Sequence, residues 1–136
     1  MGDGIGFVSA FANVTSVETT DGLVLIDTSS PFSAGLVHAA VREMSSAPVR
    51  AAVYTHGHVD HVFGILAFDA EAKAKGWQLP EVFAHENVRK RFARYLLTNG
   101  YNGRINQRQF NLPMTNLEFQ IAVKKPNSIF RKSHFF

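Results

Sequence analysis

The chain alternates short apolar runs with amphipathic segments, and this alternation does most to limit the possible fold. An apolar run at 23–26 is followed by a segment, 36–44, in which apolar residues recur every three or four positions. A second run, VRAAVYT at 49–55, comes next, and another amphipathic segment begins at Ile65. Short apolar runs are typical of buried strands, and strands that alternate with helices predict an α/β fold.

Local signals place the ends of these elements. Residues 13–26 read as a hairpin, with Asp21 and Gly22 as the tight turn. Ser30 followed by Pro31 predicts a helix that begins there and stops before Pro48. Its apolar face comprises Leu36, Val37, Ala40, Val41 and Met44.

Three further elements are expected downstream. The segment 65–75 reads as a helix closed by Gly76, and PEVFAH at 80–85 reads as a short strand. Asn87 is a candidate cap for another helix. Two Asn-Gly pairs in TNGYNGRINQRQF, 98–110, favour a structured loop after it.

The composition bounds the class of protein. With 136 residues, of which 46% are hydrophobic, the chain fits one globular domain. No apolar run approaches the ~20 residues of a membrane helix, and the N-terminus does not resemble a secretory signal. We therefore expect a cytoplasmic protein without a membrane partner. Because the chain has no cysteine, any metal ion must be held by nitrogen and oxygen ligands.

The positive charge is concentrated at the C-terminus. The net charge is +3, and residues 123–136 carry four basic residues and no acidic one. The rest of the chain is close to neutral, which argues against nucleic acid as a partner. We expect a domain at 1–122 and a basic, disordered tail at 123–136.

Three of the six histidines lie within six residues, in the segment YTHGHVDHVFG at 54–64. This histidine loop, with His56, His58, Asp60 and His61, directly follows the second apolar run, where α/β proteins place their sites. Neutral imidazoles and carboxylates bind divalent metal ions. Three purely structural histidines would repel one another when protonated. The pattern therefore predicts a site for one or two metal ions, which can polarise an ester and lower the pKa of a bound water toward ~7.

The motif THGHVDH resembles the signature of the metallo-β-lactamase superfamily. The run GLVLIDT and the helix and strand after it are similar to the opening of that fold. The segment from His61 to Phe110 resembles the alkyl-sulfatase-like hydrolases of the superfamily, so the resemblance covers about residues 5–112.

This resemblance implies a role for each matching residue. His56 and His58 would bind a first metal ion, and Asp60 and His61 a second one, with zinc as the expected metal and iron as an alternative. Asp60 would also orient the bridging hydroxide and so act in catalysis. Asp27 would support the ligands from behind. Ser29 stands where the family usually has glycine, which bears on the backbone turn at that position.

The resemblance also implies a second half that is not recognisable here. The family fold is a four-layer αββα sandwich, and its second αβ half supplies two more histidines and a bridging carboxylate. After His61 only His85 and His134 remain; we expect His85 to cap or pack at the start of a helix, and His134 lies in the tail. We therefore expect the chain to be the N-terminal αβ half of the sandwich, cut short. Its four candidate ligands, shared over two ions, would leave each ion with too few.

Three functions follow as expectations. The first is a metal-dependent hydrolase that uses a metal-activated hydroxide to attack an ester bond, including a sulfate ester, in a small-molecule substrate. The second is a catalytically inactive fragment, or a subunit completed by another chain or by a homo-oligomer. The third is an iron-dependent oxidative enzyme on the same fold.

Overall fold

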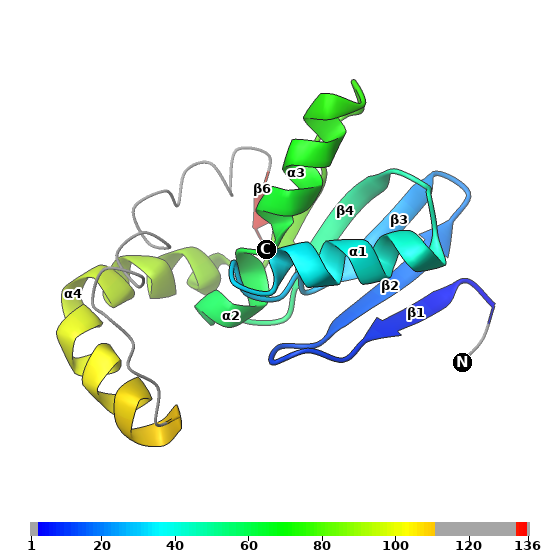
Figure 1. The fold of residues 1–136 in the computed structure, drawn as a ribbon. Coiled ribbons are helices and arrows are strands. Elements are labelled where there is room, and N and C mark those ends of the chain that lie inside the picture. The colour runs from blue at the N-terminus through cyan, green and yellow to red at the C-terminus, as the bar shows by residue number, and fades with distance from the viewer. Residues whose placement is uncertain (1–2, 111–132, 136) are drawn as a thin grey trace.

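A six-stranded sheet forms the centre of the part of the chain that the computed structural model describes, residues 3–110 and 133–135 (Figure 1). The strand order is β1-β2-β3-β4-β5-β6; the first three strands are antiparallel neighbours, and β3 to β6 are parallel. The strands are β1 Ile5–Val8, β2 Val14–Thr19, β3 Gly22–Ile26, β4 Val49–Tyr54, β5 Glu81–Ala84 and β6 Ser133–Phe135. The helices are α1 Ala34–Met44, α2 Val59–Val62, α3 Ile65–Ala74 and α4 Glu86–Phe110. The α/β class is confirmed.

The predicted hairpin is the antiparallel pair of β2 and β3. Its turn lies one residue earlier than expected, at Thr20 and Asp21, and Gly22 is the first residue of β3, paired with Thr19. Gly22 has φ +135°, a conformation that side chains rarely adopt, and a Cβ there would overlap the carbonyl oxygen of Pro48. The turn therefore needs glycine for its backbone angle and for the close approach of the chain that leads into β4.

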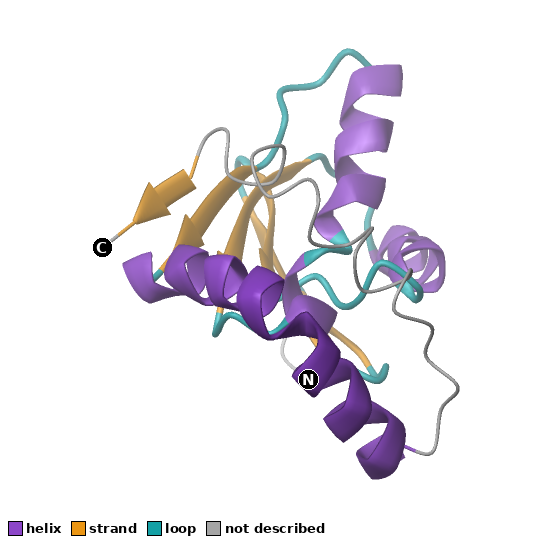
Figure 2. Cartoon of the chain, turned by 90° about the vertical axis from the view of Figure 1, so that its left-hand side faces the viewer, coloured by secondary structure: helices purple, strands orange, loops and turns teal. Residues whose placement is uncertain are grey.

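One face of the sheet carries the core. α1 and α3 lie on the same side of the strands (Figure 2), and their apolar residues pack on the strand residues that point toward them. The buried side chains of this core include Val14, Leu23, Leu25, Ala52, Tyr54, Val37, Val41 and Phe68. Alternate strand residues point to the opposite face. There Ile5, Phe7 and Ile26 are 47%, 45% and 38% exposed.

A charged cluster ties α1 to α3 at the edge of this core. Arg42 donates two hydrogen bonds to Glu71 Oε2, at 2.9 and 2.7 Å, and Lys75 lies 3.1 Å from Oε1. Burial alone would raise the pKa of Glu71, but the hydrogen bonds from Arg42, Lys75 and His38 outweigh it and lower the pKa to about 2. Glu71 therefore stays ionised and holds the two helices together.

Two sequence expectations for α1 were wrong. The helix begins at Ala34 with Ser33 as its N-cap, not at Pro31, because Ser30 and Ser33 hydrogen bond to each other in a turn that precedes the helix. Leu36 and Met44, expected on the apolar face, are exposed.

α4 continues to Phe110 through both Asn-Gly pairs, where a loop was expected. The helix leaves helical geometry only at Thr98, with φ −111° and ψ 15°. Asparagine and glycine lower the helix propensity but do not forbid the conformation. No helix among the described residues is both long and apolar enough to cross a membrane.

The expected tail begins outside the described residues, and its predicted boundary at 122 stays a prediction. Within it, however, 133–135 form β6, which pairs in parallel with β5. For these three residues the structure replaces the expected disorder with a strand, because the edge of β5 offers free backbone donors and acceptors.

Candidate metal centre

The candidate site lies where β3 and β4 end, side by side, at the same edge of the sheet. Because the two strands are parallel, their carboxyl ends deliver Asp27 and Thr55 to neighbouring positions. The Asp27 backbone N–H donates to the carbonyl oxygen of Val53 at 2.9 Å and continues the pairing past the last residue of β3. The histidine loop follows Thr55 directly, so the topology brings the predicted aspartate and histidines together.

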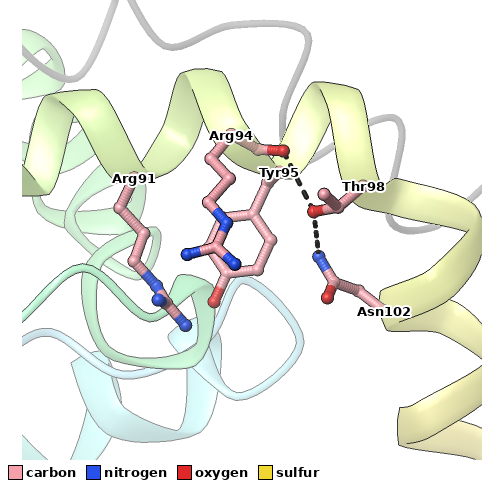
Figure 3. Close-up of a pocket in the computed structure, with 5 residues that line it drawn as sticks. All are labelled: Arg91, Arg94, Tyr95, Thr98 and Asn102. Atoms are coloured by element: carbon pink, nitrogen blue, oxygen red, sulfur yellow. Dashed lines mark hydrogen bonds between the residues drawn. The ribbon is translucent and has the colours of Figure 1, made fainter.

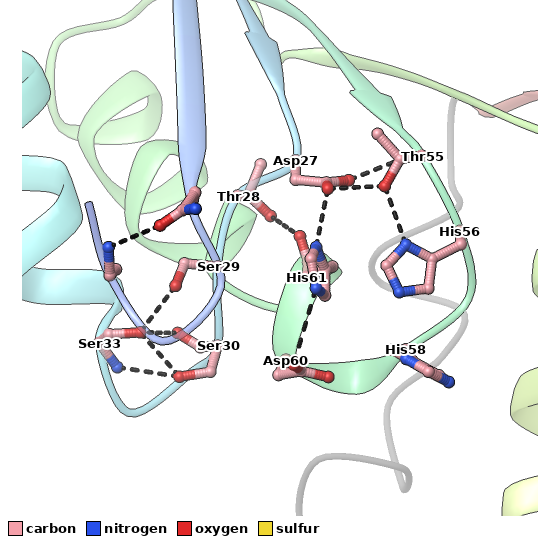
Figure 4. A network of polar contacts seen from close by, with 12 residues as sticks. Asp27, Thr28, Ser29, Ser30, Ser33, Thr55, His56, His58, Asp60 and His61 are labelled. Atoms are coloured by element: carbon pink, nitrogen blue, oxygen red, sulfur yellow. Dashed lines mark hydrogen bonds and ion pairs between the residues drawn. The ribbon is translucent and has the colours of Figure 1, made fainter. Parts of the chain in front are cut away.

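Asp27 is the centre of the polar network shown in Figure 4. Its Oδ1 accepts a hydrogen bond from the Thr55 backbone N–H at 2.8 Å. Its Oδ2 accepts from Thr55 Oγ1 at 2.7 Å and pairs with His61 Nδ1 at 2.7 Å. Asp27 is buried, and its backbone has φ 57°, which aspartate tolerates better than most residues. Both carboxylate oxygens of Asp27 are therefore engaged in hydrogen bonds that hold Thr55 and His61 in place.

This network sets the tautomers of two histidines. Because the Asp27 carboxylate accepts a hydrogen bond from His61 Nδ1–H, the neutral ring keeps its lone pair on Nε2. The single hydroxyl proton of Thr55 goes to Asp27, so Thr55 Oγ1 accepts from His56 Nδ1, 2.9 Å away. His56 Nε2 therefore also keeps its lone pair. Such hydrogen bonding behind an imidazole is how proteins orient metal-binding histidines.

His58 is held differently, by a residue of α4. The guanidinium Nη2 of Arg91 lies 3.0 Å from His58 Nε2. Since arginine only donates hydrogen bonds, this nitrogen of His58 is the acceptor and the ring is neutral. Burial lowers the pKa of His58 below its usual 6.5, and the charges of His56 and Arg91 lower it further.

The rings and carboxylates form one cluster around His56. The ring centroids of His56 and His61 are 4.2 Å apart, and those of His56 and His58 are 4.6 Å apart. His61 Nε2 lies 3.7 Å from Asp60 Oδ2. One ligand atom from each of Asp27, His56 and His61 can be chosen so that all three lie within 4.8 Å of one another.

This donor set fits a divalent metal ion. Neutral imidazoles with free lone pairs and carboxylates are the nitrogen and oxygen ligands that zinc takes. Of the predicted ligands, the structure brings His56 and His61 into one group, together with Asp27. His58 and Asp60 lie next to it, against His56 and His61 respectively, but neither belongs to the group. It stays a prediction that the ligands are His56, His58, Asp60 and His61. Asp27 is also near enough to count as a ligand, but its three hydrogen bonds favour the supporting role.

The loop after β3 is hydrogen-bonded to the end of α2 and to Gly64 just after it. Thr28 donates its backbone N–H to the carbonyl oxygen of His61 at 2.7 Å and its hydroxyl to that of Val62 at 2.8 Å. Gly64 donates its N–H to the carbonyl oxygen of Ser29 at 2.9 Å. A Cβ on Gly64 would overlap the carbonyl oxygen of Thr28. The two segments can pack this closely only because residue 64 is glycine.

Ser29 adopts the backbone conformation that favours glycine. Its φ is 64°, in the left-handed region, although the family usually has glycine there. The turn is therefore kept without the glycine. The Ser29 hydroxyl, which is fully buried, forms a hydrogen bond of 2.8 Å with the Ser33 hydroxyl, and this contact offsets part of the backbone strain.

Two histidines outside the loop have structural contacts. His85 Nδ1 accepts the N–H of Asn87 at 3.1 Å and so caps α4, as expected. Asn87 itself, the other candidate cap, lies inside the helix, which begins at Glu86. His38 packs against Phe68 and lies 3.1 Å from Glu71. For His134 the structure describes only the backbone strand.

Two partners of the site, Thr55 and Arg91, were not predicted. Thr55 could have been found from the sequence, because its hydroxyl lies between a strand and the first histidine of the loop. Arg91 could not, because no local pattern links residues 33 positions apart.

Comparison with known proteins agrees with the geometry. A family model, described as "Metallo-beta-lactamase superfamily", matches residues 10–110, most of the chain. This stretch contains β2 to β5 and α1 to α4, and with them every residue of the candidate site.

Individual relatives are longer than this chain. It is 36% identical over 73 residues to a linear primary-alkylsulfatase of Pseudomonas sp. (strain ATCC 19151), a match that covers 53% of the chain but only 14% of that protein. The structure of the stereoselective inverting sec-alkylsulfatase Pisa1 from Pseudomonas sp. is similar with a TM-score of 0.63 and 28% identity, over 83% of this chain and 19% of that one. BJP-1, a subclass B3 metallo-β-lactamase of Bradyrhizobium japonicum, gives 0.52 and 26%, over 65% of this chain and 32% of that one. The chain thus spans a minor part of each.

Proposed function

Because the chain belongs to the metallo-β-lactamase superfamily, we propose that its histidine loop is the metal centre of a metal-dependent hydrolase that cleaves ester bonds, with sulfate esters as the favoured substrates. The observation that carries the proposal is the hydrogen-bonded unit of Asp27, Thr55, His56 and His61. It leaves two Nε2 lone pairs available within one cluster. The preference for sulfate esters is supported by the similarity to two alkylsulfatases.

His56, His58, Asp60 and His61 would hold one or two divalent ions, with zinc as the expected metal. A bound divalent ion polarises an ester oxygen and lowers the pKa of water toward ~7, which makes a hydroxide available at neutral pH. The residues of the chain supply orientation: Asp27 and Thr55 fix the rings of His61 and His56 before any ion binds. Asp60, at the start of α2 and 3.7 Å from His61 Nε2, would hold and orient a water molecule beside His61.

Zinc titration of the isolated chain tests the metal centre. We expect wild-type protein to bind zinc and the variants His56→Ala and His61→Ala to bind it at least ~10-fold more weakly, since losing even supporting groups costs 10- to 100-fold. His85→Gln is the matched control, because it removes a histidine that lies outside the cluster. Equal zinc affinity in all four proteins would contradict the proposal.

A second candidate is supported by the exposed face of the sheet. Ile5, Phe7 and Ile26 are large apolar side chains on the side opposite α1 and α3, and each is more than a third exposed. An exposed apolar face favours binding to another polypeptide. We propose that a complementing chain, or a second copy of this one, covers this face and supplies the ligands that a two-ion site still needs.

Metal analysis and turnover separate these candidates. If a second polypeptide is required, the isolated chain binds fewer than two ions and releases no sulfate from an alkyl sulfate. Two bound ions per chain, with turnover that is lost in Asp60→Ala, would overturn the second candidate and support the first. Iron in place of zinc in the protein as isolated, with no hydrolysis, would favour an oxidative enzyme instead.

A further inference from the structure

A polar hollow lies beside the histidine loop, on the side of α4 that faces it. The hollow has a volume of about 50 Å³ and is lined by Arg91, Arg94, Tyr95, Thr98 and Asn102 (Figure 3). Its lining combines two guanidinium groups with hydroxyl and amide groups and includes no carboxylate. It has room for a few water molecules or for a small anionic group.

The hollow is built at the kink of α4. Thr98 leaves helical geometry, its hydroxyl donates to the carbonyl oxygen of Arg94 at 3.0 Å, and it accepts from Asn102 Nδ2 at 2.8 Å. A threonine that bonds back to the preceding turn bends a helix. The bend brings Asn102 round to the same hollow as Arg91 and Arg94, as Figure 3 shows.

Arg91 links this hollow to the candidate metal centre. Its guanidinium lies 5.3 Å from the centre of the Tyr95 ring, and its Nη2 lies 3.0 Å from His58 Nε2. A Cβ on Gly57 would lie 3.1 Å from Arg91 Cβ and 3.3 Å from the Cα of Val88. The glycine between the first two loop histidines therefore lets α4 rest directly on the loop, which fixes the stem of Arg91 beside the site.

None of the residues that the structure describes neutralises the charges of the hollow. Within the described residues, Arg94 has no carboxylate partner, and the nearest acidic residue on the helix, Glu86, pairs with Lys90 at 2.8 Å. Two guanidinium groups that face one hollow repel each other unless an anion lies between them. The forked donors of arginine match the paired oxygens of sulfate or carboxylate groups.

We propose that Arg91 and Arg94 bind the anionic group of the substrate, so that they select sulfate or other oxyanion-bearing esters over neutral ones. This inference rests on the proposed function for the identity of the ester, but the anion site itself is defined by the hollow.

Inorganic sulfate is the probe for this site, titrated into the metal-free chain and followed by calorimetry or by NMR of the arginine side-chain Nε–H groups. We expect saturable binding that becomes about tenfold or more weaker in Arg91→Ala and in Arg94→Ala, because a hydrogen bond to a charged group is lost. Arg91→Lys keeps the positive charge but lacks the paired N–H donors of the guanidinium, so we expect it to bind sulfate more weakly than wild type as well. Arg89→Ala is the matched control: it removes the same charge from the same helix, away from the hollow, and should change the affinity less than twofold.

Equal weakening by Arg89→Ala and Arg94→Ala would reduce the effect to general charge and overturn the proposal, as would the absence of saturable sulfate binding. Zinc titration gives an independent readout: Arg94→Ala should bind zinc as wild type does, because Arg94 lines the hollow and not the histidine loop. A large loss of zinc binding in Arg94→Ala would contradict an anion site that is separate from the metal ligands. If sulfate binds as expected while neither zinc nor ester hydrolysis is found, the proposed function fails and the anion site stands. If zinc binds but the arginine variants bind sulfate like wild type, only the anion site fails.

Discussion

Gly64 is the position where adding a single methyl group should most disturb the packing of the candidate site. A Cβ there would overlap the carbonyl oxygen of Thr28 and lie 3.2 Å from that of Ser29. Both atoms belong to the backbone, so no side-chain rotation relieves the overlap. The loop after β3 must move away, and Asp27 moves with it.

The expected cost follows from what the displacement breaks. Forcing extra volume into a packed region costs about 1–3 kcal/mol. Three hydrogen bonds, two from Thr28 and one from Gly64 to Ser29, join the segments that would separate, and losing two of them adds about 2 kcal/mol. We therefore expect Gly64→Ala to lower the free energy of unfolding by about 3–5 kcal/mol.

Urea denaturation measures this loss, and Gly35→Ala is the matched control. Gly35 lies on α1 with open space around it, so the same substitution there should raise the free energy of unfolding by about 0.5–1 kcal/mol through the helix propensity of alanine. Zinc affinity provides a second readout, because moving Asp27 disturbs His61. A Gly64→Ala protein within 1 kcal/mol of wild type would refute the close packing on which this reasoning depends.

Three further predictions test other contacts. Because the pKa of Glu71 is lowered to about 2 from 4.5, its ionised form stabilises the fold by about 3 kcal/mol. This contribution is complete above pH ~4.5 and is lost as the pH falls toward 2. Glu71→Gln should therefore lack this part of the pH dependence of the free energy of unfolding, and an unchanged pH dependence would contradict the pairing. Ser29→Gly and Ser29→Ala both remove the hydroxyl contact, but at φ 64° the glycine variant should be more stable by about 1 kcal/mol; equal stability in thermal unfolding would rule out the left-handed turn. Asp27→Asn should weaken zinc binding about 10- to 100-fold, because an amide cannot accept every hydrogen bond that fixes His61, whereas Asp21→Asn, in the exposed hairpin turn, should leave zinc binding unchanged.

Much of the fold was predictable because its signals are local. Turn chemistry and the spacing of apolar residues, which can be recognised within a few positions, predicted the hairpin of β2 and β3. The same signals predicted the strand after Pro48 and the helix closed by Gly76. The expectations that were wrong concern helix boundaries, where local contacts compete with one another. A turn closed by Ser30 and Ser33 delays the start of α1, and α4 stays helical through both Asn-Gly pairs apart from the kink at Thr98.

The sequence by itself determined the chemistry: which imidazoles and carboxylates are available, that they follow a buried strand, and that only nitrogen and oxygen can serve as ligands. Tertiary structure alone decided how those groups are used. The parallel pairing of β3 and β4 brings Asp27 to Thr55, Gly57 and Gly64 allow the close packing around the loop, and α4 delivers Arg91 to His58. These contacts join residues about 30 positions apart, and their strength depends on ångström-scale distances that local residue patterns do not encode.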